Sequence, residues 1–179
     1  MFRFHPLTEF VAEAVRGGAI GDLCSIQSSL FVTARQGDFR LEPSLGGGAL
    51  LDLGYYCVAV SRLLAGLEPD RVAALARFRA VGGVDSRTAG LLDFPGGALA
   101  QFSCGLRGAF DCAYTVLGTR GKLSVPRGGM VLWPGEAFRL QVALEGKPPG
   151  VREFSPCNHY RLMVEDFADA VLNNREPRI

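Results

Sequence analysis

The spacing of apolar residues along the chain predicts three helices, over residues 7–16, 46–65 and 159–172. In each stretch the apolar positions recur every three or four residues, so they fall on one side of a helix. They are Leu7, Phe10, Val11, Ala14 and Val15 in the first helix, Leu50, Leu53, Cys57, Val60 and Leu64 in the second, and Tyr160, Met163, Val164, Phe167 and Val171 in the third. Glycines follow the first two helices, and Asn158 is a suitable N-cap for the third.

Other apolar stretches alternate with polar residues or are rich in β-branched residues, and they predict strands. The predicted strands cover residues 22–34, 72–80, 88–94, 98–106, 110–117, 122–125, 130–133, 137–143 and 151–154. Residues 1–6 are predicted to be extended, because Pro6 disfavours a helical conformation at His5.

This order of elements predicts an α+β fold, with helices packed on one face of a large, open, mostly antiparallel sheet. The chain contains no internal repeat and no linker, so one domain over residues 1–179 is expected. The other face of the sheet carries small and apolar residues, and an uncovered face of that kind usually marks an interface. A homo-oligomer that forms through this open face is therefore expected.

Charge and composition exclude several classes of partner. The formal net charge is +1, and there is no run of lysine or arginine. Neither nucleic acid nor an acidic membrane surface is therefore expected to bind. The apolar run over residues 49–60 contains Asp52 and is too short to cross a membrane. Arg3, His5 and Pro6 stand where a signal peptide would be apolar, so a cytoplasmic protein is expected.

The cysteines and histidines do not form a recognisable metal-binding pattern. The five cysteines are scattered, without a Cys-x-x-Cys pair, and the two histidines, His5 and His159, lie far apart. Cysteines embedded in apolar stretches are typical of buried, reduced thiols in a cytosolic protein. No metal site is predicted.

The best candidate for a site is the stretch Gly46-Gly47-Gly48 followed by Asp52 and Tyr56. Glycine permits a close-packed backbone, and residues four apart lie on the same side of a helix. A carboxylate and a phenol would therefore meet in the first turns of an apolar helix. Two structural interpretations compete: Asp52 could cap free N–H groups, and Tyr56 could be a core aromatic residue. The glycines match neither a P-loop nor a dinucleotide fingerprint.

Short motifs in a fixed order along nearly the whole chain resemble one protein family. They are residues 1–6, Gly18-Ala19-Ile20-Gly21-Asp22, Asp38-Phe39-Arg40, residues 46–56, Glu68-Pro69, Gly83-Val84-Asp85, Asp93-Phe94-Pro95-Gly96-Gly97, Gly118-Thr119-Arg120-Gly121, and Tyr160 with Glu165 and Phe167. Together they resemble the C-terminal domain of the glucose–fructose oxidoreductase and inositol dehydrogenase (Gfo/Idh/MocA) family of NAD(P)-dependent oxidoreductases. The subgroup of glucose–fructose oxidoreductase and dihydrodiol dehydrogenase is the most similar.

The resemblance implies a parent protein in which a Rossmann domain precedes an α+β domain that shapes the substrate pocket and builds oligomers. It implies catalytic roles for Asp52, at the position of the family's conserved acid, and for Tyr56, as proton donor or acceptor. The residues implied to contact a sugar, polyol or diol substrate are Arg3, His5, Arg40 and Tyr160. For Arg3 and Arg40, an ion pair at the surface or between domains is the competing interpretation.

The chain departs from the family pattern in lacking both Gly-x-Gly-x-x-Gly and Glu-Lys-Pro motifs. The N-terminal Rossmann domain and the activating lysine are therefore expected to be absent from it. A cut piece, a natural fragment and a start assigned to an internal methionine are three explanations that stay open. NAD or NADP is expected in the full-length parent, with no cofactor and no hydride transfer for this chain alone. The alternative function is a non-catalytic scaffold that self-associates through its sheet or pairs with a separate nucleotide-binding chain, and a small-sugar binding module is a third.

Overall fold

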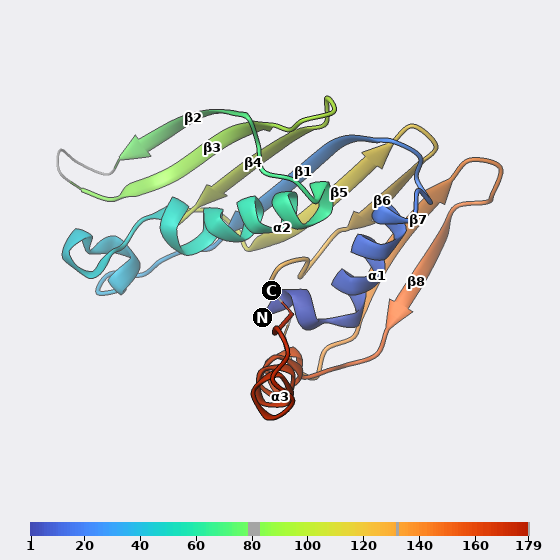
Figure 1. Ribbon diagram of the computed structural model, residues 1–179. Helices are drawn as coiled ribbons and strands as arrows, with labels where there is room; N and C mark the ends of the chain where they lie inside the picture. Colours follow the sequence, from blue (N-terminus) through green and yellow to red (C-terminus); the bar gives the residue numbers. More distant parts are fainter. Residues whose placement is uncertain (79–82, 132, 179) are drawn as a thin grey trace.

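The structure, a computed structural model, describes residues 1–78, 83–131 and 133–178 (Figure 1). The helical elements are η1 (Phe2–Phe4), α1 (Pro6–Arg16), η2 (Phe39–Leu41), η3 (Pro43–Leu45), the π-helical turn η4 (Leu50–Gly54), α2 (Tyr55–Ala65) and α3 (His159–Leu172). The strands are β1 (Leu23–Phe31), β2 (Arg71–Phe78), β3 (Asp85–Asp93), β4 (Leu99–Gly105), β5 (Asp111–Gly118), β6 (Gly121–Val125), β7 (Phe138–Leu144) and β8 (Gly150–Phe154).

The strands form one open eight-stranded sheet in the order β2-β3-β4-β1-β5-β6-β7-β8. All neighbouring strands run antiparallel except β1 and β4, which are parallel. The predicted α+β fold with a large, mostly antiparallel sheet is therefore confirmed.

Strand β1 lies at the centre of the sheet, between β4 and β5, although it comes first in the sequence. Ile26 and Leu30 point toward the helices and are fully buried, whereas Gln27 lies on the opposite face and is exposed. This alternation follows from the two-residue period of a strand. A parallel pair such as β1 and β4 needs a long crossover connection, and α2 lies in it, so the connection carries α2 across the sheet.

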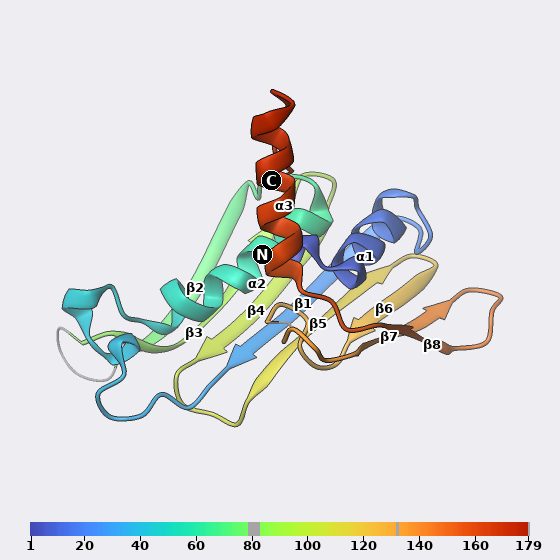
Figure 2. The same cartoon turned by 90° about the horizontal axis from the view of Figure 1, so that it is seen from below.

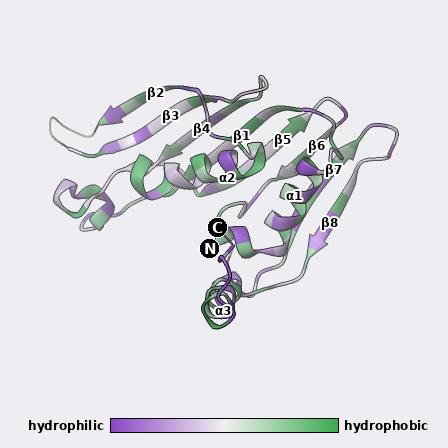
Figure 3. Ribbon diagram, viewed as in Figure 1, coloured by the Kyte–Doolittle hydropathy of each residue, from purple (hydrophilic) through white to green (hydrophobic). Residues whose placement is uncertain are grey.

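Helices α1 and α2 cover one face of the sheet, and in the described part of the chain no element covers the other (Figures 1 and 2). Leu7 and Val11 of α1 and Val60 of α2 have no exposed surface. Helix α3 is arranged differently, because it projects away from the sheet beyond the other two helices (Figure 2). Hydrophobic residues are nevertheless prominent on both α2 and α3 (Figure 3).

Two predicted segments differ from the structure. Residues 2–4 form a 3₁₀ turn with Phe2 and Phe4 buried, and only His5 is extended, because proline restricts just the residue before it. The strand predicted over 130–133 is a bend at Met130 and Val131, whose N–H groups donate to the Cys112 sulfur. Leu132 lies outside the described residues, as does the end of the strand predicted over 72–80.

All the cysteines are free thiols. Burial raises the pKa of Cys57 to about 12 and that of Cys104 to about 11, which keeps both thiols protonated and poorly reactive. Within the described residues, no three His, Cys, Asp or Glu side chains come together as metal ligands would.

The helical stretch Pro43–Ala65 is long and apolar enough to cross a membrane, although the apolar run over residues 49–60 within it was predicted to be too short. Core helices of soluble proteins can have the same length and composition. Here Cys57, Val60 and Leu64 of this helix are part of the hydrophobic core. The stretch is therefore weak support for a membrane location.

Candidate functional site

Gly47 and Gly48 hold the preceding loop, which contains Arg40, against the start of the helical segment η4–α2. The Gly47 N–H donates to the Glu42 carbonyl and the Gly48 N–H to the Arg40 carbonyl, each over 3.0 Å. A Cβ atom on Gly47 would lie 2.6 Å from the Arg40 carbonyl oxygen, so only glycine fits there. The close approach fixes the position of Arg40 next to the helix.

Asp85, at the start of β3, holds the first turn of the helix from the sheet side. Its carboxylate accepts hydrogen bonds from the Leu50 N–H over 2.9 Å and from the Thr88 hydroxyl over 2.6 Å. A Cβ atom on Gly48 would lie 2.4 Å from an Asp85 oxygen, and Gly48 has φ +130°. Asp85 belongs to the motif Gly83-Val84-Asp85, but its role was not predicted from the sequence.

The chain then forms the π-helical turn η4, in which the Tyr55 N–H donates to the Leu50 carbonyl. Single π-helical turns inside α-helices frequently occur at functional sites. Asp52 lies within this turn, and Tyr56 follows it in the first turn of α2.

Asp52 forms an ion pair with Arg40 at the surface of η4. The Arg40 Nε donates to the Asp52 carboxylate over 2.5 Å, and its Nη1 lies 3.3 Å from Asp38. These side chains are one-fifth to one-third exposed. The hydrogen bond that Arg40 donates to Asp52, together with the charges of the Asp52 and Asp38 carboxylates, raises the pKa of Arg40 and keeps it protonated. The Asp52 carboxylate bonds to Arg40 and makes no capping hydrogen bond at η4. This contact is the surface ion pair that competes with a substrate-binding role for Arg40, and the site roles of both residues stay predictions.

Tyr56 is half-buried between the rings of Tyr55, at a centroid distance of 4.0 Å, and Phe2, at 6.2 Å. Burial raises the pKa of Tyr56, and the neighbouring Tyr55 hydroxyl and the charge of Asp52 add to the effect. The phenol is therefore neutral in this chain. Asp52 and Tyr56 are close enough for this charge effect, but no hydrogen bond joins them.

The other three predicted substrate-binding residues, Arg3, His5 and Tyr160, have different surroundings from this pair. His5 is buried, its Nδ1 accepts the Leu7 N–H as the N-cap of α1, and burial lowers the pKa of His5 to about 4. Arg3 lines a cavity of about 340 Å³ beside α1, and Tyr160 is exposed on α3. Among hydrogen bonds, ion pairs and ring contacts of the described residues, none joins these three to Asp52 or Tyr56. Their substrate contacts stay predictions.

The glycine motif does not fit the pyrophosphate of a dinucleotide. A pyrophosphate binds where glycine N–H groups point toward it, but those of Gly47 and Gly48 already bond to backbone carbonyls. The Asp85 carboxylate occupies the space beside Gly48, where its negative charge would repel a phosphate. This chain thus offers no nucleotide site at its glycine motif.

An open, mostly antiparallel sheet with a helical layer on one face is the domain architecture that the resemblance of the sequence implied. The family model described as GFO/IDH/MocA C-terminal domain matches residues 8–124. The chain belongs to the Gfo/Idh/MocA family, as its C-terminal domain.

Two curated proteins are similar in sequence to this chain over all or nearly all of its length. It is 35% identical to D-xylose 1-dehydrogenase (NADP(+)) 2 of Haloferax volcanii, covering 100% of this chain and 54% of that protein. It is 30% identical to dTDP-3,4-didehydro-2,6-dideoxy-alpha-D-glucose 3-reductase of Actinomadura kijaniata, covering 99% and 53%. The chain therefore spans about half the length of the curated relatives it matches.

Solved structures share the fold. The aldose-aldose oxidoreductase of Caulobacter crescentus, complexed with glycerol, superimposes with a TM-score of 0.88 at 26% identity, covering 99% of this chain and 54% of that one. A 3-ketoreductase of Actinomadura kijaniata, in complex with NADP and TDP-benzene, gives 0.85 at 27% identity, covering 99% and 55%.

Proposed function

We propose that residues 1–179 form one domain, the substrate-binding and dimerisation half of an NADP-dependent oxidoreductase acting on a CH–OH group of a sugar, polyol or diol. The cluster of Arg40, Asp52 and Tyr56 at η4 carries the proposal. It combines a neutral phenol and a fixed carboxylate at the surface of the helical layer. The names of the relatives support NADP and sugar substrates.

Each of the three residues has a proposed role in the transfer of the hydroxyl proton. Oxidation of an alcohol removes its hydroxyl proton, and reduction of a ketone supplies one. In the direction of reduction Tyr56 donates the proton, since the phenol is protonated in this chain. In the direction of oxidation it accepts the hydroxyl proton as phenolate, which requires positive charge supplied by the preceding half to lower its raised pKa. Asp52 accepts a hydrogen bond from a substrate hydroxyl, and Arg40 fixes the direction of that carboxylate.

The test is a chimera in which the half of the Actinomadura kijaniata 3-ketoreductase that this chain does not span precedes Met1. The chimera is expected to form NADPH from NADP⁺ with at least one member of a panel of aldoses, polyols and trans-diols. The 179-residue chain alone is the control and is expected to be inactive. A folded chimera that binds NADP⁺ but oxidises no member of the panel would contradict the proposal.

Dimerisation is proposed to use the open face of the sheet. The pairing register of the strands places four leucines on this face. Leu75, Leu91, Leu99 and Leu117 are 83, 53, 53 and 45% exposed there. An apolar surface of this kind is typical of an interface. The same observation supports the alternative function, a non-catalytic scaffold that self-associates.

A dimer is therefore expected in light scattering of the 179-residue chain at micromolar concentration. Replacing Leu91 by aspartate is expected to give a monomer, since the charge would be buried without a partner. Leu51→Asp, at an exposed leucine on the helical side, is the matched control and leaves the dimer intact. A wild-type monomer would exclude both the dimer and the self-associating scaffold.

A further inference from the structure

The two histidines of the chain are far apart in the sequence but meet in the interior, each at the start of a helix. His5 precedes α1, and His159 is the first residue of α3. The centroids of their rings are 6.0 Å apart, and only 1% and 0% of their surfaces are exposed. The ring of Phe138, at the start of β7, meets the His5 ring edge-on at 5.4 Å. The pair therefore lies where α1, α3 and the sheet come together.

Both imidazoles are neutral in the folded chain. The Nδ1 of His5 accepts the Leu7 N–H over 3.1 Å, which requires this nitrogen to be unprotonated. Among the described residues, the Nε2 of His5 and both ring nitrogens of His159 have no hydrogen-bond partner. Burial and the neighbouring His159 lower the pKa of His5 to about 4, and burial lowers the pKa of His159. A positive charge on either ring would be buried without a partner, which is costly.

The charged groups around the pair do not compensate such a charge. They are the amino group of Met1 and Arg3 in η1, Glu9 on α1, Cys157 before α3, Tyr160 and Asp166 on α3, Arg178 after it, and Arg139 beside Phe138. The Met1 amine adds positive charge near His159. The two carboxylates, Glu9 and Asp166, are both paired with Arg178, and burial raises the pKa of the neutral Cys157 thiol. In the described part of the chain, no carboxylate hydrogen-bonds to either imidazole.

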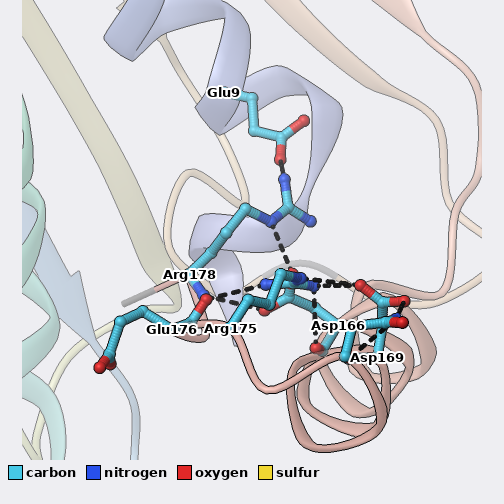
Figure 4. A network of polar contacts seen from close by, with 7 residues as sticks. Glu9, Asp166, Asp169, Arg175, Glu176 and Arg178 are labelled. Carbon is cyan, nitrogen blue, oxygen red and sulfur yellow. Dashed lines mark hydrogen bonds and ion pairs between the residues drawn. The ribbon is translucent and has the colours of Figure 1, made fainter.

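The other end of α3 has an anchor that does not depend on pH in the same range. Helix α3 projects away from the sheet and packs against η1 (Figure 2). Asp166 accepts hydrogen bonds from the Arg178 N–H over 2.9 Å and from the Arg175 guanidinium over 2.8 Å (Figure 4). The bond from the Arg178 N–H is the largest of the effects that lower the Asp166 pKa below its ordinary value of 3.8. This anchor therefore stays charged at pH 5, and the histidine end alone is sensitive to mild acid.

We propose that His5 and His159 form an acid-sensitive switch, in which protonation of either ring separates the first turn of α3 from the start of α1. Protonation of His5 also removes the acceptor of the Leu7 N–H and places a positive charge at a helix N-terminus, where the helix dipole opposes it. Because both pKa values are lowered by folding, the contact is fully stable above the ordinary histidine pKa of 6.5 and is lost as the pH falls toward 4. The switch involves none of the residues of the proposed site, so it goes beyond the proposed function.

Amide hydrogen exchange of the 179-residue chain, followed by NMR at pH 7 and pH 5 and corrected for the intrinsic rate of each amide, tests the switch. The reporters are the N–H groups of Leu7, which donates to His5, and of Leu162, which donates to the Asn158 carbonyl in the first turn of α3. Their protection is expected to fall at least tenfold. An imidazole whose pKa changes from about 4 to 6.5 on opening increases the opening constant roughly twentyfold over this range.

Two other amides are the internal controls. The Arg178 N–H is held by Asp166, and Ile26 lies in the central strand. Their protection is expected to change less than about twofold, because the opening is local. An equal fall at all four amides would mean that the whole chain unfolds, and it would overturn the proposal.

Two substitutions remove the titration while keeping the packing. Asparagine in His5→Asn still offers an N-cap acceptor, and phenylalanine in His159→Phe fills the same buried space. The chain has no other histidine, and the Met1 amine is common to both proteins, so the double variant is expected to show no pH effect at Leu7 and Leu162. The same pH effect in the double variant, or none in the unmodified chain, would overturn the proposal.

A second measurement needs no variant. The imidazole NMR signals of the unmodified chain are expected to keep the positions of neutral rings at pH 6, because both pKa values are lowered. Half-protonation near pH 6.5, with the protection of Leu7 and Leu162 unchanged, would show that the rings take up protons without opening the contact. That result would overturn the proposal even if the double variant did not fold.

Discussion

Replacing Tyr56 by phenylalanine in the chimera is expected to lower kcat by about a hundredfold, with little change in the thermal stability of the protein. In NADPH formation Tyr56 accepts the hydroxyl proton, and positioned general acids and bases typically contribute about 10²–10⁴-fold to a rate. The Tyr56 ring packs between Tyr55 and Phe2, and phenylalanine keeps these ring contacts while removing the hydroxyl. Steady-state NADPH formation, measured with the substrate found in the panel, gives kcat and KM.

Tyr55→Phe is the matched control, because Tyr55 is the adjacent tyrosine and is half exposed. Its hydroxyl contributes to the raised pKa of Tyr56 but has no proposed part in proton transfer. A small change in kcat is expected for this variant. Equal kcat values for Tyr56→Phe and the unmodified chimera would remove Tyr56 from the mechanism and leave the domain with a binding role only.

The sequence predicted the parts of the fold that depend on local periodicity. The alternation along β4 assigns Ala100, Phe102 and Cys104 to the buried face, and these side chains are buried. The position of β1 between β4 and β5 could not be predicted in the same way. Strand order depends on pairing between residues about 75 and 90 positions apart, such as Ser25 with Leu99 and Thr115 with Gln27.

In the site, too, positions on one helix could be predicted from the sequence, whereas contacts between residues far apart in the sequence could not. Spacing alone brought Asp52 and Tyr56 onto one helix, and both lie at its start. The partner of Asp52 is Arg40, twelve residues earlier, and the residue that holds Leu50 is Asp85, 35 residues later. No periodic pattern links such positions. The π-helical turn was missed for a similar reason, since it depends on how the glycine turn and Asp85 constrain the first residues of the helix.

Helix α3 shows that a periodic pattern does not reveal what it packs against. The spacing predicted an apolar side of α3 made of Tyr160, Met163, Val164, Phe167 and Val171, of which all but Met163 are exposed. The same spacing occurs in a helix that faces its own core and in one that does not. Asp166 decides the outcome here, because its two arginine partners lie after the helix and hold its polar flank inward.

Replacing Gly48 by alanine is expected to destabilise the 179-residue chain by about 2–5 kcal/mol. A φ of +130° is a conformation that residues with a Cβ rarely adopt, and such strain costs about 1–3 kcal/mol. The new Cβ would also lie 2.4 Å from the Asp85 carboxylate. If Asp85 moves away, the Leu50 N–H loses a hydrogen bond to a charged group, worth about 1.5–3 kcal/mol. Urea unfolding followed by circular dichroism measures the difference.

Gly46→Ala is the matched control within the same three glycines. Gly46 also has a positive φ, +73°, but a Cβ there would meet no atom within 4 Å. Its cost is therefore the backbone strain alone, about 1–2 kcal/mol. The difference between the two variants combines the greater backbone strain at φ +130° with the contact to Asp85. Asp85→Ala removes only the contact and is therefore expected to reduce the additional cost of Gly48→Ala. Equal losses for Gly46→Ala and Gly48→Ala would show that Asp85 does not hold the start of the helix, and the fixed geometry proposed for Asp52 would lose its support.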